Sequence, residues 1–248
     1  MSLSASNRIR KLAGKAIGDF GLIDDGDHIA VGISGGKDSM ALMRVLEKLR
    51  QRAPVSYRLI GVTIDPGFPG FPAAAIGDYF NRQGMPFHCE KTVINEILAE
   101  KRRRESSWCS FCARLRRGIL YTVAQRLGCN KIALGHHLDD FIETLLLNQF
   151  YSGTIAAMSP KLLADNGIQT VIRPLAYVEE RAVEEFVREE DIPVFESSCP
   201  ALENKDRKRQ RTKELIANLE AEIPQLKRSL RNALGNVQPR HLWDLRLK

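Results

Sequence analysis

The chain lacks the features of a membrane protein, a secreted protein and a repeat protein. No apolar run approaches the roughly 20 residues that span a bilayer, and residues 1–10 lack the apolar core of a signal peptide. The five cysteines are an odd number, which argues against a disulfide framework. Neither an internal repeat nor a low-complexity tract is present. We therefore expect a cytoplasmic protein that makes no contact with membranes.

Length and composition are those of an ordinary globular protein. The 248 residues suit one large α/β domain or one domain with a helical appendage, and 44% of them are hydrophobic. Charged residues make up 27% and leave a net charge of +7 at pH 7, with an isoelectric point of about 9.3. Many enzymes of this size pair, so a homodimer is the expected assembly.

The excess positive charge is clustered in three blocks. The residues of these blocks that we expect to contact a polyanion are Arg102, Arg103, Arg104, Arg114, Arg116, Arg117, Lys208 and Arg209. Clustered basic side chains attract nucleic acid by releasing its counterions. The alternative is a set of solvated helix faces without a partner. We favour nucleic acid, because motifs for ATP and cysteine chemistry lie beside the blocks.

Short apolar runs alternate with longer helical patterns through most of the chain. The expected strands are residues 28–33, 57–65, 86–94, 131–135 and 171–175. The expected helices include residues 9–22, 40–49, 112–127, 138–150 and 179–190. This alternation predicts an α/β fold with a doubly wound parallel sheet. Ligands bind such sheets outside the carboxyl ends of the strands, so the loops after the strands hold the candidate site.

A glycine-rich loop follows the first expected strand. Its residues are Ser34, Gly35, Gly36, Lys37, Asp38 and Ser39. Glycines allow close backbone approach, free N–H groups at a helix start attract anions, and Lys37 adds positive charge. The loop is not a Walker A motif, because Asp38 follows Lys37 and Val31 stands at the first glycine position. It matches the pyrophosphate loop of enzymes that split ATP between its α- and β-phosphates; the alternative is an ordinary glycine turn.

A second polar cluster follows the fourth expected strand and includes Gly135, His136, Asp139 and Asp140. It is expected to face the glycine-rich loop across the edge of the sheet. Adjacent carboxylates near ATP are natural Mg²⁺ ligands, and Gly135 allows close approach to the nucleotide. The alternative is a helix start whose acids favour the helix dipole. Asp65, at the end of the second expected strand, adds a third carboxylate at the same edge.

Three cysteines carry the third pattern. Cys109 and Cys112 have the C-x-x-C spacing that lets two thiolates share a metal, and Cys199 lies far away in sequence. Cys112 is expected to open a helix, whose dipole lowers a thiol pKa. A zinc site with His88 or His241 as fourth ligand, a redox pair and an iron–sulfur cluster all fit the spacing. The other two cysteines, Cys89 and Cys129, are expected to be buried.

Several stretches together resemble the tRNA 2-thiocytidine synthetase family of pyrophosphate-loop (PP-loop) ATPases. The matching stretches are SGGKDS at 34–39, PGFP at 66–69, the CxxC-x-RLRRGILY run at 109–121, KIALGHHxDD at 131–140, the ET-LLLNQFYSG run at 143–153, MSPKL at 158–162, VIRPLAY at 171–177 and the late cysteine at 199. The cysteine–arginine run separates this family from the lysidine synthetases, which share the glycine-rich loop. The chain is short for the family at its N-terminus.

The resemblance implies an ATP-dependent, AMP-forming tRNA sulfurtransferase. Such enzymes adenylate the C2 oxygen of a cytidine at tRNA position 32, and sulfur then replaces that oxygen at C2 as AMP leaves, giving 2-thiocytidine. The family's pyrophosphate-binding positions match Ser34, Gly35, Gly36, Lys37, Asp38 and Ser39, with Asp65, Gly135 and His136 also expected at the nucleotide. Lys37, Asp38, Asp139 and Asp140 would be catalytic, the last two through Mg²⁺.

Sulfur transfer and chain organisation follow from the same resemblance. Cys109, Cys112 and Cys199 would hold a 4Fe–4S cluster that carries the incoming sulfur, supplied by a cysteine desulfurase or by sulfide, with zinc as the alternative metal. The expected parts are an N-terminal helix at 1–24, the ATP-binding domain at 25–200 and a basic helical tail at 201–248. The alternatives are a PP-loop enzyme for another base (a lysidine-type ligase, thiolase or desulfurase) and a cluster-based redox sensor.

Overall fold

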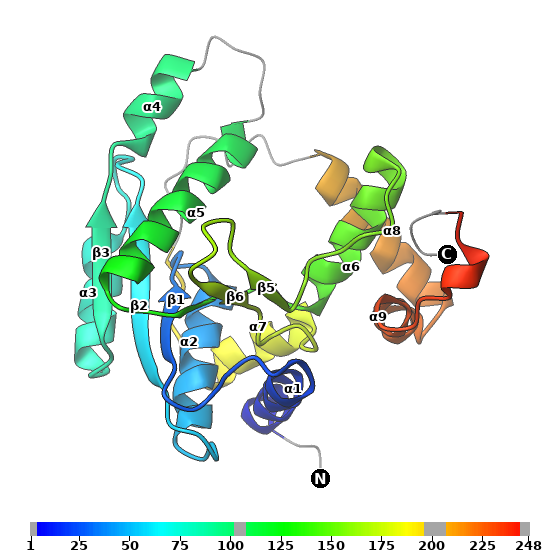
Figure 1. The fold of residues 1–248 in the computed structure, drawn as a ribbon, viewed down its shortest axis with the longest axis horizontal. Coiled ribbons are helices and arrows are strands. Elements are labelled where there is room, and N and C mark those ends of the chain that lie inside the picture. Colours follow the sequence, from blue (N-terminus) through cyan, green and yellow to red (C-terminus); the bar gives the residue numbers. More distant parts are fainter. Residues whose placement is uncertain (1–3, 102–107, 196–206, 244–248) are drawn as a thin grey trace. The chain divides into compact units, whose positions relative to one another are not determined.

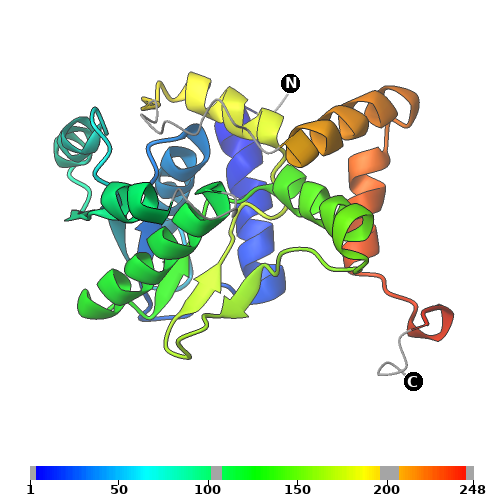
Figure 2. The same ribbon diagram turned by 90° about the horizontal axis from the view of Figure 1, so that it is seen from above.

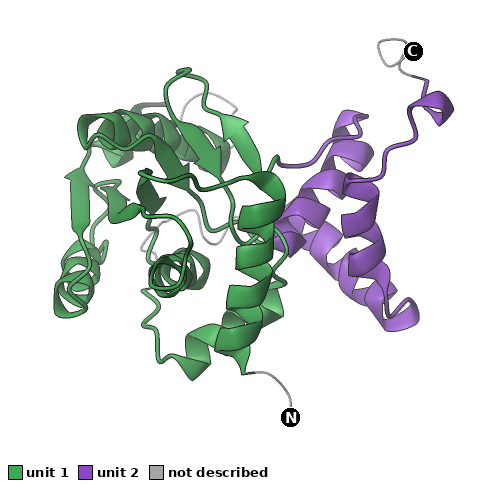
Figure 3. Ribbon diagram, turned by 60° about the horizontal axis from the view of Figure 1, so that its bottom comes forward, with its two compact units in different colours: residues 1–137, 159–203 green, residues 138–158, 204–248 purple. Residues whose placement is uncertain are grey.

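The computed structural model describes residues 4–101, 108–195 and 207–243. These residues form two compact units (Figure 3), residues 1–137 with 159–203 and residues 138–158 with 204–248. The first unit contains the sheet and the glycine-rich loop. The second unit is helical. Cys199 and Arg102–Arg104 lie outside the described residues.

A single sheet organises the first unit, with strand order β3-β2-β1-β4-β6-β5 (Figure 1). The strands are β1 (His28–Gly32), β2 (Arg58–Asp65), β3 (Phe87–Lys91), β4 (Lys131–Ala133), β5 (Lys161–Leu163) and β6 (Thr170–Ile172). All neighbours are parallel except β5 and β6. The expected α/β class is confirmed. Chain order reverses beside β1, because β2 and β4 flank it, and ligands bind at such a point.

The strand β5 corrects the expectation of a wholly parallel sheet. Lys161–Leu163 runs antiparallel to β6 and forms one edge of the sheet. A tight connection joins the two strands, with Gly167 at φ +69° and the Ala164 N–H donating to the Gln169 carbonyl at 2.8 Å. Asn166 and Gly167 are a hairpin signal in the sequence. The sequence predicts a strand at residues 171–175. The observed strand, β6, begins one residue earlier and ends at Ile172.

Alternate residues of the strands face opposite layers of helices. Ile29 and Val31 join one apolar cluster, whereas Ala30 and Ile132 join the other. The first layer contains α1 (Ala5–Phe20), α2 (Lys37–Arg50), α3 (Ala73–Arg82) and α7 (Glu180–Glu189), and the second contains α4 (Ile94–Lys101) and α5 (Trp108–Arg126). Figure 2 shows α1 beside α7. The two layers bury both faces of the central strand β1 at Ile29, Ala30 and Val31, whereas the edge strand β5 is exposed.

The second unit is built from α6 (Leu138–Leu147), the π-helix η1 (Asn148–Ser152), α8 (Arg207–Glu222), α9 (Leu226–Leu234) and the short η3 (Pro239–His241). Its core is small and centres on Leu138, Ile142 and Ile216. The helix expected at 138–150 is α-helical only to Leu147, and from Asn148 the chain has π-helical geometry. None of the helices within the described ranges is long and apolar enough to cross a membrane.

Candidate functional site

The glycine-rich loop after β1 is shaped by its own two serines. The hydroxyls of Ser34 and Ser39 are 3.1 Å apart, and the Ser39 hydroxyl donates to the Gly36 carbonyl at 2.9 Å. Gly35 has a φ of +86°, a left-handed conformation that favours glycine. Gly36 is the N-cap of α2, which begins at Lys37 and has no side-chain cap. A helix start without a side-chain acceptor is the arrangement that binds phosphate in many nucleotide sites.

Gly135 brings the loop after β4 against this helix start. A Cβ built on Gly135 would lie 2.9 Å from the carbonyl carbon and oxygen of Asp38 and 3.0 Å from the Ser39 nitrogen. These are backbone atoms, so no change of side-chain rotamer could relieve the clash. Only glycine fits, so the loops after β1 and β4 touch at the carboxyl edge of the sheet.

Lys37 is held beside the loop by two carboxylates. Its Nζ lies 2.9 Å from Glu180 Oε1 at the start of α7 and 3.2 Å from Asp38 Oδ1. Desolvation alone would lower the pKa of Lys37, but the two carboxylates outweigh it and raise the pKa above its usual value. The buried His137 places Nε2 3.8 Å from the same Asp38 oxygen. Lys37 is therefore a fixed positive charge, and its partner Glu180 was not foreseen from the sequence.

A cavity of about 460 Å³ opens beside the loop at the carboxyl ends of β1, β2 and β4. Its apolar lining includes Ile33, Val62, Ile64 and Leu134, and Ser34 belongs to it as well. Its charged lining residues are Arg114, Arg116, Arg117 and Arg173. No aspartate or glutamate lines this cavity within the part of the chain that the structure describes. Several arginines in a concave, partly apolar space create a positive potential that attracts an anion.

Arg173 is the least exposed of these arginines. It follows β6 directly and retains only 8% of its accessible surface. Its Nε donates to His136 Nδ1 at 3.2 Å, and its Nη1 donates to the Ser159 carbonyl. The VIRPLAY stretch marked this position as part of a family pattern but suggested no role. The sequence offered no other signal, because Arg173 and His136 meet only through the pairing of β4 with β6.

Asp65 has a local structural task at the end of β2. Its Oδ1 accepts the Gly67 N–H at 2.9 Å, and its backbone carbonyl accepts the Thr92 hydroxyl at 2.7 Å. Gly67 has a φ of +80°, so the Asp65 carboxylate stabilises a turn that needs glycine. Its expected place at the nucleotide stays a prediction.

The two carboxylates at the start of α6 belong to the second unit, and each has a basic partner there. Asp139 Oδ1 lies 2.9 Å from Lys227 Nζ, and Asp140 Oδ1 lies 2.6 Å from Arg209 Nη2. Arg209 also contacts Glu143 at 2.7 Å. Within the described ranges no group of three His, Cys, Asp or Glu side chains could hold a metal ion. A Mg²⁺ ion at Asp139 and Asp140 would have to compete with these ion pairs.

Comparison with known proteins gives the family. Residues 2–219 match the model of the PP-loop domain. The chain is 59% identical over 241 residues to the tRNA-cytidine(32) 2-sulfurtransferase of Geobacter sulfurreducens, covering 97% of this chain and 94% of that protein. It is 57% identical to the protein of the same name from Syntrophotalea carbinolica, covering 97% and 93%. The chain belongs to the tRNA-cytidine(32) 2-sulfurtransferase family.

Solved structures support the fold of this sulfurtransferase family member. The U34-tRNA thiolase NcsA from Methanococcus maripaludis, solved with its [4Fe-4S] cluster, is 23% identical with a TM-score of 0.75. The likeness covers 94% of this chain and 81% of that one. An NH3-dependent NAD synthetase from Campylobacter jejuni is 15% identical with a TM-score of 0.51, covering 97% and 95%. These structures confirm the expected fold, and the family model with the more than half identical relatives confirms the expected family.

The cysteines of the sulfurtransferase chain are only partly described. Cys112 is half-buried in the second turn of α5, which begins at Trp108, so it does not open the helix as expected. Its thiol therefore lacks the helix-start position on which the expected pKa shift rested. Cys129 is buried as predicted, whereas Cys89 is only partly buried. The Cys109 side chain and Cys199 lie outside the described part of the chain, so the three-cysteine set stays a prediction.

The basic residues expected to bind tRNA lie in both units. Arg114, Arg116 and Arg117 line the cavity from α5. In the second unit, Lys208 lies over the ring of Tyr151, with Nζ 4.7 Å from its centroid. The charge of Arg209 is shared with the carboxylates already described.

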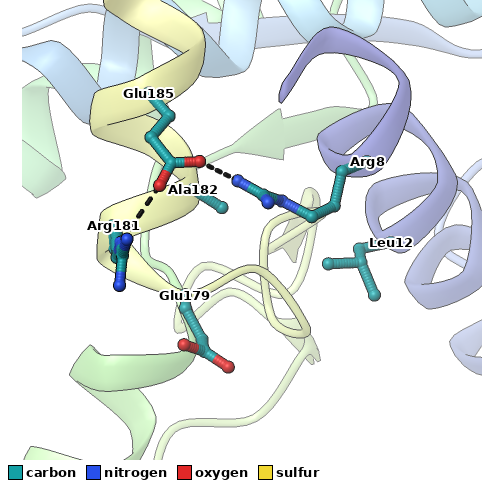
Figure 4. A pocket seen from close by; sticks show the side chains of 6 residues that line it. All are labelled: Arg8, Leu12, Glu179, Arg181, Ala182 and Glu185. Atoms are coloured by element: carbon teal, nitrogen blue, oxygen red, sulfur yellow. Dashed lines mark hydrogen bonds and ion pairs between the residues drawn. The ribbon is translucent and has the colours of Figure 1, made fainter. Parts of the chain in front are cut away.

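A second cavity of the first unit lacks the charge imbalance of the arginine-lined one. It has a volume of about 380 Å³ and lies between α1 and α7 (Figure 4). Glu185 reaches toward Arg8 and Arg181, with Arg181 Nε 3.0 Å from Glu185 Oε1. Arg8, the largest influence, and Arg181 together hold the pKa of Glu185 below its usual value. Since Glu179 is a second acid in the lining, the charges balance; the Arg8–Glu185 ion pair joins α1 to α7, and the Arg181–Glu185 pair lies within α7.

Proposed function

We propose that this chain is a tRNA sulfurtransferase that adenylates the C2 oxygen of cytidine 32 with ATP and then replaces that oxygen with sulfur, so that AMP leaves. The observation that carries the proposal is the close contact of Gly135 with the start of α2, directly after the glycine-rich loop. Beside this contact lies a cavity whose charged residues, among those described, are all arginines. The names of relatives that are more than half identical support the substrate and the reaction.

ATP is proposed to place its phosphates on the loop and the start of α2. The uncapped helix start, the left-handed Gly35 and the charged Lys37 together suit a polyphosphate. In the present arrangement the Lys37 ammonium is 2.9 Å from Glu180 and 3.2 Å from Asp38, and a bound phosphate would offer it a third anionic partner. The apolar wall formed by Ile33, Val62 and Ile64 offers a surface for a base in the same cavity.

The arginines of α5 are proposed to stabilise charge during adenylation. A carbonyl oxygen is a poor leaving group, and its transfer to the α-phosphate builds negative charge on the phosphoryl oxygens. Fixed cations aimed at that charge are worth more in a concave site than in water. Arg114, Arg116 and Arg117 line the cavity and supply such cations.

Two described side chains, those of Cys112 and Asp38, are candidate ligands for the iron–sulfur cluster and for Mg²⁺, respectively. Cys112 is the one cysteine of the predicted three whose side chain is described, and it belongs to the same helix as Arg114, Arg116 and Arg117. A bound 4Fe–4S cluster would carry the incoming sulfur that replaces the C2 oxygen, whereas a zinc ion would carry none. Asp38 Oδ1 is buried and forms an ion pair with Lys37 but accepts no hydrogen bond, so Asp38 is a further candidate ligand for Mg²⁺ at the loop.

Exposed aromatic side chains suit single-stranded RNA in the second unit. Phe150 and Tyr151 lie in η1 and keep 54% and 48% of their accessible surfaces. Lys208, at the basic start of α8, lies over the Tyr151 ring. Aromatic platforms with adjacent cations stack unpaired bases and hold the phosphates, as a tRNA anticodon loop requires. Phe150 and Tyr151 lie in a π-helix that continues the C-terminal end of α6, and π geometry is frequent at functional sites.

The direct test is nucleoside mass spectrometry on tRNA from a bacterial strain that lacks 2-thiocytidine, with and without this gene. The proposal requires 2-thiocytidine to appear, Lys37→Ala to abolish it by removing ATP binding, and Cys109→Ala to abolish it while ATP binding remains. Iron content should fall in Cys109→Ala and persist in Lys37→Ala.

The same samples separate the alternatives. A change in the sulfur content of another nucleoside would identify a different target base. Full iron content in Cys109→Ala would overturn the ligand assignment. A protein without iron that attaches an amine would be a lysidine-type ligase, and AMP formation that does not depend on tRNA would favour a nucleotide-binding sensor.

A further inference from the structure

We propose that Arg173 binds a phosphate group in the arginine-lined cavity and that His136 is the positioning residue that aims it. The inference deepens the proposed function and rests on it, because the phosphate would belong to one of that reaction's two substrates. Arg173 has no part in the glycine-rich loop, so its site is additional to the residues expected from the PP-loop motif.

The first argument is the burial of a charge without a counter-ion. Arg173 is 8% exposed, yet no carboxylate within the described ranges lies within ion-pairing distance of it. Its partners are an imidazole nitrogen of His136 and the backbone carbonyl of Ser159. Proteins rarely bury an arginine without pairing it, because removing a charge from water is costly. An anion held in the cavity would supply the missing pair.

The second argument is the number of donors that remain. A guanidinium carries five N–H groups in a planar fork. Hydrogen bonds occupy the Nε–H, which faces His136, and one hydrogen of Nη1, which faces Ser159. The remaining donors belong to a side chain that lines the cavity. A planar fork of donors matches two oxygens of a phosphate.

The third argument is the surrounding field. Desolvation, and to a smaller extent the neighbouring Arg117, lower the pKa of Arg173, whereas Tyr121 opposes them. The environment thus disfavours the charged form in the absence of a ligand. Since Arg114 and Arg116 line the same cavity, a multiply charged anion gains more there than a carboxylate would.

The fourth argument is the place of Arg173 in the sheet. Ala133 pairs with Ile172 in the parallel ladder. Arg173, the residue after β6, therefore lies beside Leu134, the residue after β4. His136 follows two residues later, just past the glycine that touches the start of α2. Ser34 of the glycine-rich loop lines the same cavity as Arg173. This proximity favours the phosphate chain of ATP; a backbone phosphate of the RNA is the other source.

Two binding measurements on the full chain distinguish the sources. Calorimetry with α,β-methylene-ATP and filter binding with unmodified tRNA would be run on wild type, Arg173→Gln and Arg173→Lys. A hydrogen bond to a charged group is worth about 1.5–3 kcal/mol, so Arg173→Gln should weaken one ligand about ten- to one-hundred-fold. Arg173→Lys should recover part of the loss. The matched control is Arg181→Gln, because Arg181 is 85% exposed and its cavity has balanced charges.

Each outcome decides the inference. A loss of nucleotide affinity alone assigns the site to ATP, and a loss of tRNA affinity with a salt slope smaller by about one assigns it to an RNA phosphate. Unchanged affinity for both ligands in Arg173→Gln overturns the inference. If Arg173→Gln does not fold, Arg173→Lys provides the same test, because it keeps the charge but loses the fork.

The positioning role of His136 has its own readout. His136→Asn keeps a side-chain acceptor for Arg173 Nε, whereas His136→Ala removes it. The affinity that depends on Arg173 should fall in His136→Ala and recover in His136→Asn; equal affinities in the two variants would refute the role. If the wild-type protein binds ATP and yields 2-thiocytidine but the Arg173 variants bind both ligands normally, only this inference is refuted. Absence of both properties from wild type refutes the proposed function instead.

Discussion

Replacement of Gly135 by alanine tests whether the contact between the two loops positions the nucleotide site. The added Cβ would stand 2.9 Å from the carbonyl carbon and oxygen of Asp38. Carbon atoms prefer a separation of about 3.5 Å or more, so the start of α2 must move by roughly 0.6 Å. Overpacking of this kind costs about 1–3 kcal/mol of unfolding free energy. Displacement of a catalytic element by up to 1 Å can cost about 100-fold in rate.

Urea unfolding and the rate of 2-thiocytidine formation measure the two consequences of Gly135→Ala separately. The matched control is Gly18→Ala in α1, where an added Cβ meets no atom within 4 Å. That helical replacement should leave activity unchanged and stabilise the protein by about 0.5–1 kcal/mol. We expect Gly135→Ala to lose both stability and activity. Wild-type stability together with wild-type nucleotide affinity in Gly135→Ala would refute the reasoning.

Buried or paired groups give three further predictions. Lys131→Met should lower the free energy of unfolding in urea by about 3–5 kcal/mol. The reason is that the buried Asp27, which lies 2.6 Å from Lys131 Nζ, would lose its cation. A decrease below about 1 kcal/mol would contradict this prediction. The hydrogen bond and charge of Lys131 lower the pKa of Asp24 below 3.8, so Asp24 contributes stability that is present above that pH and lost as pH falls through the lowered pKa. Asp24→Asn should therefore flatten the acid limb of a stability–pH curve, and an unchanged limb would count against the pairing. Burial raises the pKa of Cys129 to about 11, so iodoacetamide at pH 8 should label Cys129 only after unfolding, as peptide mass spectrometry would show; labelling of the folded protein would contradict the burial.

Local sequence patterns determined the core of the fold and the nucleotide loop. An apolar strand, a run of glycines and a helical pattern are each set by residues close together in the chain, so residues 28–50 predicted β1, the loop and α2 correctly. The family followed from the same stretches and is confirmed by relatives of high identity. The edge strand β5 was missed although Asn166-Gly167 signals a hairpin, because three residues are too few to show a periodicity.

The tertiary structure decided which charged groups meet. Lys37 pairs with Glu180 although 143 positions separate them, and Arg173 donates to His136 across 37 positions. Pairing of parallel strands and packing of helices fix such meetings, and no local period records them. For the same reason the sequence placed basic residues in blocks but could not show that, among the described residues, arginines from α5 and from the end of β6 line one cavity without an acid. The loop could be read from neighbouring residues, whereas the balance of charge around it depends on distant residues that only folding brings together.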